Sequence, residues 1–212
     1  MVTPLDAITP IHNALRQDIE LIDTAALGIA RGTAGLEATL QRFRFLNEVL
    51  VWHATGEELA VFPAVEAVAP LVTETYERDH RGLDAAFAAL NAAVAAGDAL
   101  ATARATAAFK FHLDLHLSKE DAQLFPIAKE RVSLRDQGKA AGVMAAEVPP
   151  DRQPEFIAWL FPLIGHDDRE TMLRVQQMVL PSAVFAGVRQ IVRRAIGDDW
   201  AELTRRIPEL EA

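Results

Sequence analysis

The sequence predicts an all-α protein: an up-down four-helix bundle with additional C-terminal helices packed on it. Strand signals are nearly absent, because alanine is abundant and runs of β-branched residues are short. Long segments instead repeat apolar residues every three to four positions, which is the period of an amphipathic helix. Breaker residues divide roughly the first 130 residues into four long segments with short connections, and short connections favour antiparallel neighbours.

Helix-start and helix-stop signals set the bounds of these four segments. A threonine cap followed by Pro10 starts the first, Pro63 is expected to stop the second, and Asp98 caps the fourth. The expected helices run from Thr9-Pro10 to Gly28–Gly35, from Leu36 to Phe62, from after Pro70 to Gly97, and from Asp98 to about Phe125-Pro126 or a little beyond.

From about residue 133 onward, prolines divide the chain into shorter helices. Apolar spacing persists in this part, so we expect it to pack on the bundle rather than stand alone. The chain is therefore divided into a bundle, residues 1–132, and a helical C-terminal extension, residues 133–212. The expected helices of the extension are Leu134–Ala146, Glu155–Ile164, Asp168–Val179, Ser182–Ile196 and a short Asp199–Arg206.

Composition excludes several classes of function. The 21 Lys and Arg against 30 Asp and Glu give a net charge of −9, which argues against binding nucleic acid or anionic lipid. Because the chain has no cysteine, disulfides, thiolate catalysis and cysteine-built metal sites are excluded. Met1–Asp6 lacks the features of a signal peptide, and no uncharged stretch reaches the ~18 residues that span a bilayer. We expect a cytoplasmic protein with no nucleic-acid or membrane partner.

An eleven-residue segment occurs twice and carries the chemistry. His53–Pro63 and His116–Pro126 share the pattern H-x3-E-[ED]-x2-[VL]-F-P, and one further histidine precedes each copy. Residues four apart on a helix point to the same side, about 5–6 Å apart, so each His-x3-Glu forms a pair. If the two hairpins pack face to face, four imidazoles and two carboxylates converge in the core. These are His12, His53, Glu57, His80, His116 and Glu120.

Such a cluster predicts a metal site. Buried without partners, it would cost several kcal/mol, and metal cations remove that cost by taking the lone pairs. Two carboxylates shared between two imidazole-bearing halves form the ligand set of a dinuclear site, with the glutamates able to bridge. Nitrogen and oxygen donors with open positions favour reactive iron, although zinc and manganese are compatible with the same donors.

These residues resemble the hemerythrin-like proteins with an HHE cation-binding domain, which are non-haem diiron four-helix bundles. The order H…HxxxE…H…HxxxE is matched by His12, by His53 with Glu57, by His80, and by His116 with Glu120, within about residues 9–130. The resemblance implies two iron ions held by these six ligands, with both glutamates bridging, and a small ligand such as O2, H2O2 or NO. Oxygen-carrying hemerythrins use five histidines, one Glu and one Asp, so this set puts simple oxygen transport in doubt.

Two other classes of function compete with a peroxide- or NO-processing centre. The first is an iron-, oxygen- or redox-responsive sensor or interaction module without turnover, whose partner the sequence does not identify. In that case the helices after Ser133 would report the state of the metal. The second is a purely structural helical protein with a relict site.

Two aromatic residues are candidates for supporting the ligands. His112 lies one turn before His116, so we expect it to point toward the same end of the pocket, as a ligand, as a donor behind the ligands, or at the solvent edge. Tyr76, the sole tyrosine, lies one turn before His80. It either borders the site or is an ordinary core aromatic.

Two acidic residues follow the glutamate ligands directly. Glu58 and Asp121 turn about 100° away from these glutamates, so they either orient an imidazole N–H, lie on a solvated face or form an inter-helix ion pair. Apolar neighbours are candidates for limiting solvent access. These are Trp52, Leu83 and Phe111.

Overall fold

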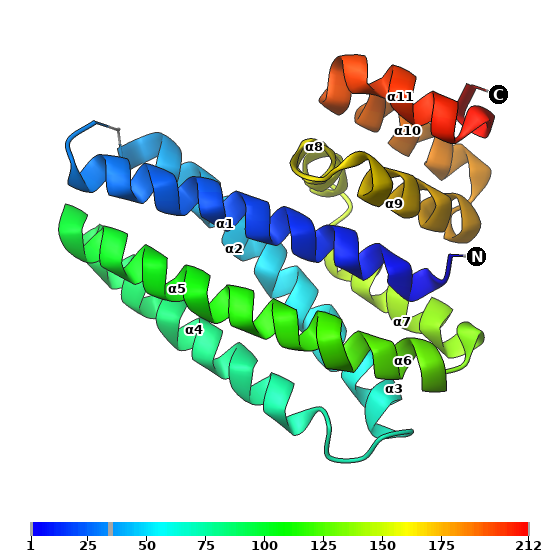
Figure 1. The fold of residues 1–212 in the computed structure, drawn as a ribbon, viewed down its shortest axis with the longest axis horizontal. Coiled ribbons are helices and arrows are strands. Elements are labelled where there is room, and N and C mark those ends of the chain that lie inside the picture. The colour runs from blue at the N-terminus through cyan, green and yellow to red at the C-terminus, as the bar shows by residue number, and fades with distance from the viewer. Residues whose placement is uncertain (1, 34–35, 212) are drawn as a thin grey trace.

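The computed structural model describes residues 2–33 and 36–211, and within them every regular element is helical. This confirms the predicted all-α bundle. Four long helices lie side by side in up-down order, with short connections at alternate ends (Figure 1). Residues 34 and 35 of the expected Gly28–Gly35 helix end lie outside the described residues. The four helices are α1 (Ile8–Ala30), α2 (Leu36–Gly56), α4 (Glu74–Ala95) and α5 (Ala99–Lys119).

Local chemistry explains two of the helix starts. The short 3-10 turn η1 (Pro4–Ala7) leads into α1, and the Asp6 carboxylate there accepts the backbone N–H of Thr3 at 2.6 Å. Asp98 caps α5 as predicted, because its carboxylate accepts the backbone N–H of Ala101 at 2.9 Å. Each interaction satisfies a donor that would otherwise be unpaired near a helix end.

The second helix does not stop at Pro63, so that expectation was wrong. The fourth helix, expected to reach about Pro126 or a little beyond, continues to Arg131. Each widens into one π-helical turn and then continues through the proline. In these turns the N–H groups of Phe62 and Phe125 donate to the carbonyls five residues back. A proline ring clashes with the carbonyl four residues back in an α-helix, and the wider turn relieves this clash while the chain stays helical. The turns are η2 (Glu57–Val61) and η3 (Glu120–Leu124), followed by α3 (Phe62–Glu66) and α6 (Phe125–Arg131).

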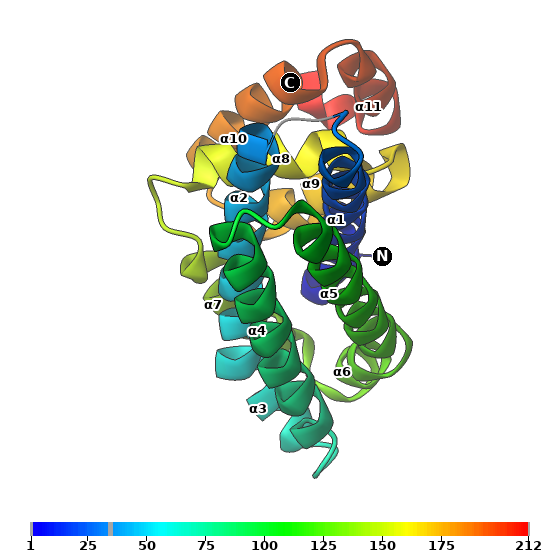
Figure 2. The same ribbon diagram turned by 90° about the vertical axis from the view of Figure 1, so that its left-hand side faces the viewer.

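The C-terminal helices cover the α1–α2 side of the bundle, away from α4 and α5 (Figure 2). Helix α7 packs on α2 and on the π turn η2, while α8 and α9 pack on α1. Their bounds agree closely with the ranges predicted from the sequence, and α10 matches its predicted range at both ends. These helices are α7 (Leu134–Glu147), α8 (Gln153–Leu163), α9 (His166–Val179), α10 (Ser182–Ile196) and α11 (Trp200–Arg206).

A buried carboxylate joins the bundle to the extension. Asp18 of α1 is fully buried and forms an ion pair with Arg42 of α2. Its other oxygen accepts the indole N–H of Trp159 of α8 at 2.9 Å. Three helices therefore meet at one carboxylate. None of the helices described is long and apolar enough to cross a membrane.

Candidate metal centre

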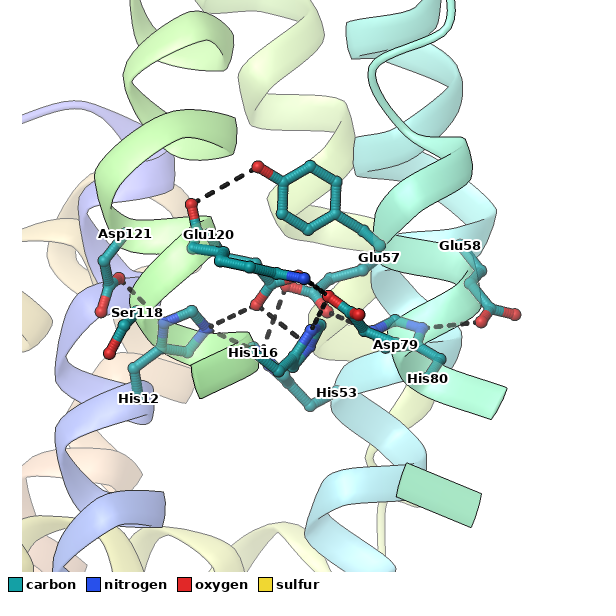
Figure 3. A network of polar contacts seen from close by, with 12 residues as sticks. His12, His53, Glu57, Glu58, Asp79, His80, His116, Ser118, Glu120 and Asp121 are labelled. Carbon is teal, nitrogen blue, oxygen red and sulfur yellow. Dashed lines mark hydrogen bonds and ion pairs between the residues drawn. The ribbon is translucent and has the colours of Figure 1, made fainter. Parts of the chain in front are cut away.

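The six predicted ligand residues lie together inside the bundle (Figure 3). The four histidines come from the four long helices, and each glutamate is the first residue of a π turn. All six side chains are buried, with exposed fractions between 0 and 8%. The set comprises His12, His53, Glu57, His80, His116 and Glu120.

The six residues form two overlapping groups. Within each group, one ligand atom per residue lies within 4.8 Å of every other. Each group takes two histidines from a single hairpin and shares both glutamates with the other group. The first contains His12 and His53 and the second contains His80 and His116, each together with Glu57 and Glu120.

Glu57 lies between histidines of different hairpins. Its Oε1 is 3.3 Å from Nε2 of His53, one turn earlier on the same helix. Its Oε2 is 3.5 Å from Nε2 of His80, which belongs to the other hairpin. The two oxygens of this carboxylate therefore face two different imidazoles.

Glu120 faces one histidine from each hairpin. Its Oε2 is 3.4 Å from Nε2 of His116 and 3.6 Å from Nε2 of His12. Two nitrogen or oxygen ligands bonded to the same ion at about 2.1 Å are about 3.0–3.4 Å apart. The separations at both glutamates are near this range, so only small movements are needed for joint coordination.

The acidic residue after each glutamate hydrogen-bonds a histidine of the other hairpin. Nδ1 of His12 donates to Asp121 at 2.8 Å, and Nδ1 of His80 donates to Glu58 at 2.7 Å. Arg16 holds the second oxygen of Asp121 at 2.7 Å. A carboxylate on Nδ1 selects the tautomer whose Nε2 lone pair points to the centre. The geometry therefore favours orientation of an imidazole N–H at both positions, while Asp121 also forms an inter-helix ion pair with Arg16 and Glu58 is 49% exposed.

Sequence reasoning missed Asp79. Its carboxylate lies 3.7 Å from Nδ1 of His116 and forms an ion pair with Lys119 (Figure 3). The residue stands immediately before His80 on α4, and no repeated motif marks it. Only the packing of α4 against α5 reveals that it backs a histidine of the neighbouring helix.

Tyr76 is a core aromatic that also lies close to the site. It is buried, packs on Phe62, and its hydroxyl donates to the backbone carbonyl of Lys119 at 3.4 Å. Burial, together with the nearby charge of Glu120, raises the pKa of its phenol. Both sequence interpretations of this residue therefore apply in part.

Of the three roles expected for His112, the structure supports the solvent-facing one and not that of a ligand or of a donor behind the ligands. Its side chain is exposed, and its ring contacts the exposed ring of Phe111 at a centroid distance of 5.8 Å. The buried side of α5 is centred on Leu113 and Leu117, and His112 lies about 100° from Leu113 around the helix. Phe111, which is 65% exposed, does not shield the site either.

The buried carboxylates lack hydrogen-bond donors. Among the described residues, no partner satisfies any of the four oxygens of Glu57 and Glu120, and Nε2 of His80 is also unpaired. Buried polar atoms are almost always paired, so a cluster of five exceptions requires an explanation. Hard oxygen and imidazole donors that converge in this way fit metal cations.

Charge states around the glutamates agree with this interpretation. Burial raises the pKa of Glu120, and the charge of Glu57 raises it further, well above the ordinary value. At Glu57 burial acts in the same direction, but His53 and His80 outweigh it and lower the pKa. Without a cation the two carboxylates therefore repel each other, and Glu120 tends to stay protonated. A cation between them would allow both to ionise.

Two histidines are poised as neutral ligands. Burial lowers the pKa of His12, and it lowers the pKa of His116 to about 4. A neutral imidazole is the form that binds metal. The desolvation that penalises imidazolium therefore favours the state that coordination needs.

A cavity of about 210 Å³ reaches the cluster between α2, α4 and α5. His53, His80 and His116 form part of its wall, and the predicted shielding residue Leu83 lines it. Trp52 lines a different cavity, on the opposite side of α2. The first cavity gives a small molecule a place beside the histidines.

A family model described as the hemerythrin HHE cation-binding domain matches residues 3–128. The chain belongs to this family. The match spans all six clustered residues and both π turns, so the resemblance inferred from the motif order is confirmed. The domain is accordingly a metal-binding one.

Among curated proteins, zinc finger protein BRUTUS of Arabidopsis thaliana is 25% identical over 187 residues, which covers 85% of this chain and 15% of that protein. A BRUTUS-like zinc finger protein of the same plant is 22% identical over 202 residues, covering 89% and 16%. Both alignments are too long to end at residue 128, so they include C-terminal helices. The chain spans about a sixth of these relatives. No solved structure matches it significantly.

Proposed function

We propose that the six-residue cluster holds two iron ions, with Glu57 and Glu120 bridging them. The observation that carries the proposal is that two pairs of histidines share two carboxylates whose four oxygens are buried and have no hydrogen-bond partner among the described residues. His12 and His53 would complete one position, and His80 and His116 the other. We retain residues 1–132 as the metal domain and 133–212 as its helical extension.

We further propose that the centre binds or processes a small ligand such as O2, H2O2 or NO. Iron bound there would supply open coordination positions and electrons for such a ligand. The protein supplies the cavity between α2, α4 and α5, which meets three of the histidines. Leu83, Phe87 and Phe109 line it and limit bulk water, while Glu58 keeps a proton on Nδ1 of His80.

Metal content of matched variants tests the ligand assignment. Glu57→Ala and Glu120→Ala should each lose most of the iron bound after anaerobic reconstitution, because each removes a ligand from both positions. Glu130→Ala, an exposed glutamate on α6, should keep the wild-type content. Wild-type iron content in both ligand variants would refute the bridging roles.

Narrowing the cavity tests the ligand route separately. Ala54→Leu adds bulk to the cavity wall without removing a proposed ligand, so iron content should be retained and the reaction with O2, H2O2 or NO should slow. Ala92→Leu, on the exposed face of α4, is the matched control and should react like wild type. Equal rates for both variants with all three ligands would contradict this route.

A sensor function is the second candidate, and one contact favours it. A methyl group on Gly56 would lie 2.8 Å from Cα of Met144, so α2 and α7 approach closely just before Glu57. Helix α7 also packs on the π turn that begins with Glu57. A change at this glutamate would therefore reach the C-terminal helices directly.

Hydrogen exchange distinguishes the two candidates. A sensor predicts that metal removal increases exchange in α7–α9 as strongly as in α2, because the metal state is transmitted to the extension. A self-contained centre predicts that the change stays within the four bundle helices. Protection of α7–α9 that is independent of metal would exclude the sensor.

A further inference from the structure

A second cavity lies between the bundle and the C-terminal extension. It has a volume of about 200 Å³ and is bounded by α1 and α2 on one side and by α7, α8, α9 and α10 on the other. Its lining is predominantly aliphatic and aromatic, including Ile11, Trp52, Phe156 and Val175. An apolar cavity of about 150 Å³ stays dry and accepts a benzene-sized molecule, so this space is large enough for a small organic ligand.

The cavity runs inward from the surface to His53, a member of the six-residue cluster. Val179 and Val184 at the α9–α10 turn are 47% and 48% exposed, which places a mouth on the extension. Val49 and His53 of α2 are buried and form the inner wall. A molecule that fills the cavity therefore contacts His53 on the side of α2 opposite the cavity between α2, α4 and α5.

The polarity of the lining defines the ligand. No Asp, Glu, Lys or Arg is among the described lining residues, and the lining histidine, His53, already faces Glu57, so a buried carboxylate or ammonium would have no free counter-charge. Gln176 supplies one polar atom for a ligand, because its Oε1 is buried and has no hydrogen-bond partner among the described residues. That oxygen is an acceptor, and only a donor can satisfy it.

We propose that this cavity is a binding site for a neutral, apolar small molecule that carries one hydroxyl, as in an alkylphenol. The apolar body would fill the space between α2 and the extension, and the hydroxyl would donate to Oε1 of Gln176. The features that define this ligand, the apolar lining and Oε1 of Gln176, include neither of the carboxylates proposed to hold iron, so the proposal can fail or hold separately from the iron centre.

Calorimetric titration with three matched probes tests the proposal on the 212-residue chain, both metal-free and iron-loaded. The probe 4-propylphenol, with about ten non-hydrogen atoms, should bind roughly 2- to 10-fold more tightly than propylbenzene, the increment expected of one hydrogen bond. The anion 4-propylbenzoate should bind more weakly than either, because the cavity offers it no cation. Absence of phenol binding, or equal binding of the benzoate, would overturn the proposal.

Variants locate the binding. Ala141→Phe fills the cavity and should abolish phenol binding, whereas Ala146→Phe, an exposed neighbour outside the lining, should not. Gln176→Leu should remove the preference for phenol over propylbenzene, and the exposed Gln177→Leu should retain it. If Ala141→Phe fails to fold, the glutamine pair decides the question. Unchanged phenol selectivity in Gln176→Leu would place the ligand elsewhere.

Discussion

Replacing Gly56 by alanine should destabilise the protein through a clash between α2 and α7. The new Cβ would lie 2.8 Å from Cα and 2.9 Å from Cγ of Met144, whereas carbon atoms in contact are normally about 3.5–4.0 Å apart. Because one contact is with backbone, the helices must separate by a substantial fraction of an ångström. Overpacking of this kind costs about 1–3 kcal/mol.

The same substitution at a second glycine separates the cost of the clash from the effect of helix propensity. Replacing a helical glycine with alanine gains about 1 kcal/mol on its own. Gly142, on the exposed face of α7, has open space where its Cβ would be, so Gly142→Ala should show only that gain. The free energies of unfolding of the two variants should therefore differ by about 1–3 kcal/mol, with Gly56→Ala the less stable.

Thermal and urea unfolding measure this difference. For a chain of this size 1 kcal/mol shifts Tm by about 2–4 °C, so the two melting temperatures should differ by roughly 2–12 °C. Both variants are compared metal-free, so that altered metal retention does not contribute. If Gly56→Ala proved as stable as Gly142→Ala, the close approach of α7 to the residue before Glu57 would be refuted.

Three further predictions follow from the buried polar groups. Asp121→Asn should weaken metal binding about 10-fold or more, because the charged acceptor of the His12 N–H is lost. Competition with a chelator measures the metal affinity, and an unchanged affinity would contradict the prediction. Asp18→Ala should lower the free energy of unfolding in urea by about 3 kcal/mol, because it breaks the buried hydrogen bond to Trp159 and the ion pair with Arg42. A decrease below about 1 kcal/mol would refute the idea that Asp18 anchors the extension to the bundle. Glu120→Gln should stabilise the metal-free protein by about 1 kcal/mol or more at neutral pH, because folding no longer has to protonate a carboxyl group whose pKa is raised by burial and by Glu57. The same variant should retain less metal. A destabilised metal-free variant would refute that electrostatic reasoning.

The sequence predicted the helices well where local signals decide the outcome. Asp98 caps α5 through its own carboxylate, and the predicted range Ser182–Ile196 is reproduced because proline and glycine bracket it. The convergence of six residues also followed from local periodicity, since His-x3-Glu fixes each pair on one face.

Features that depend on tertiary packing were not predictable. Local signals at Pro63 predict a helix stop, yet the helix continues through it because a π turn that begins at Glu57 accommodates the proline. His112 shares a helix with His116, but the angle at which α5 packs leaves it exposed. Asp79 and the cavity beside Gln176 arise only where separate helices meet. In each case a distance between elements, which no spacing along the chain encodes, decides the result.

Metal stoichiometry after anaerobic iron reconstitution tests the central claim most directly. Elemental analysis, with protein concentration from amino-acid analysis, should give two irons per chain, and the oxidised sample should show near-ultraviolet absorption from oxygen-to-iron charge transfer. A content of one iron or none in the folded protein would contradict a centre in which two histidine pairs share Glu57 and Glu120.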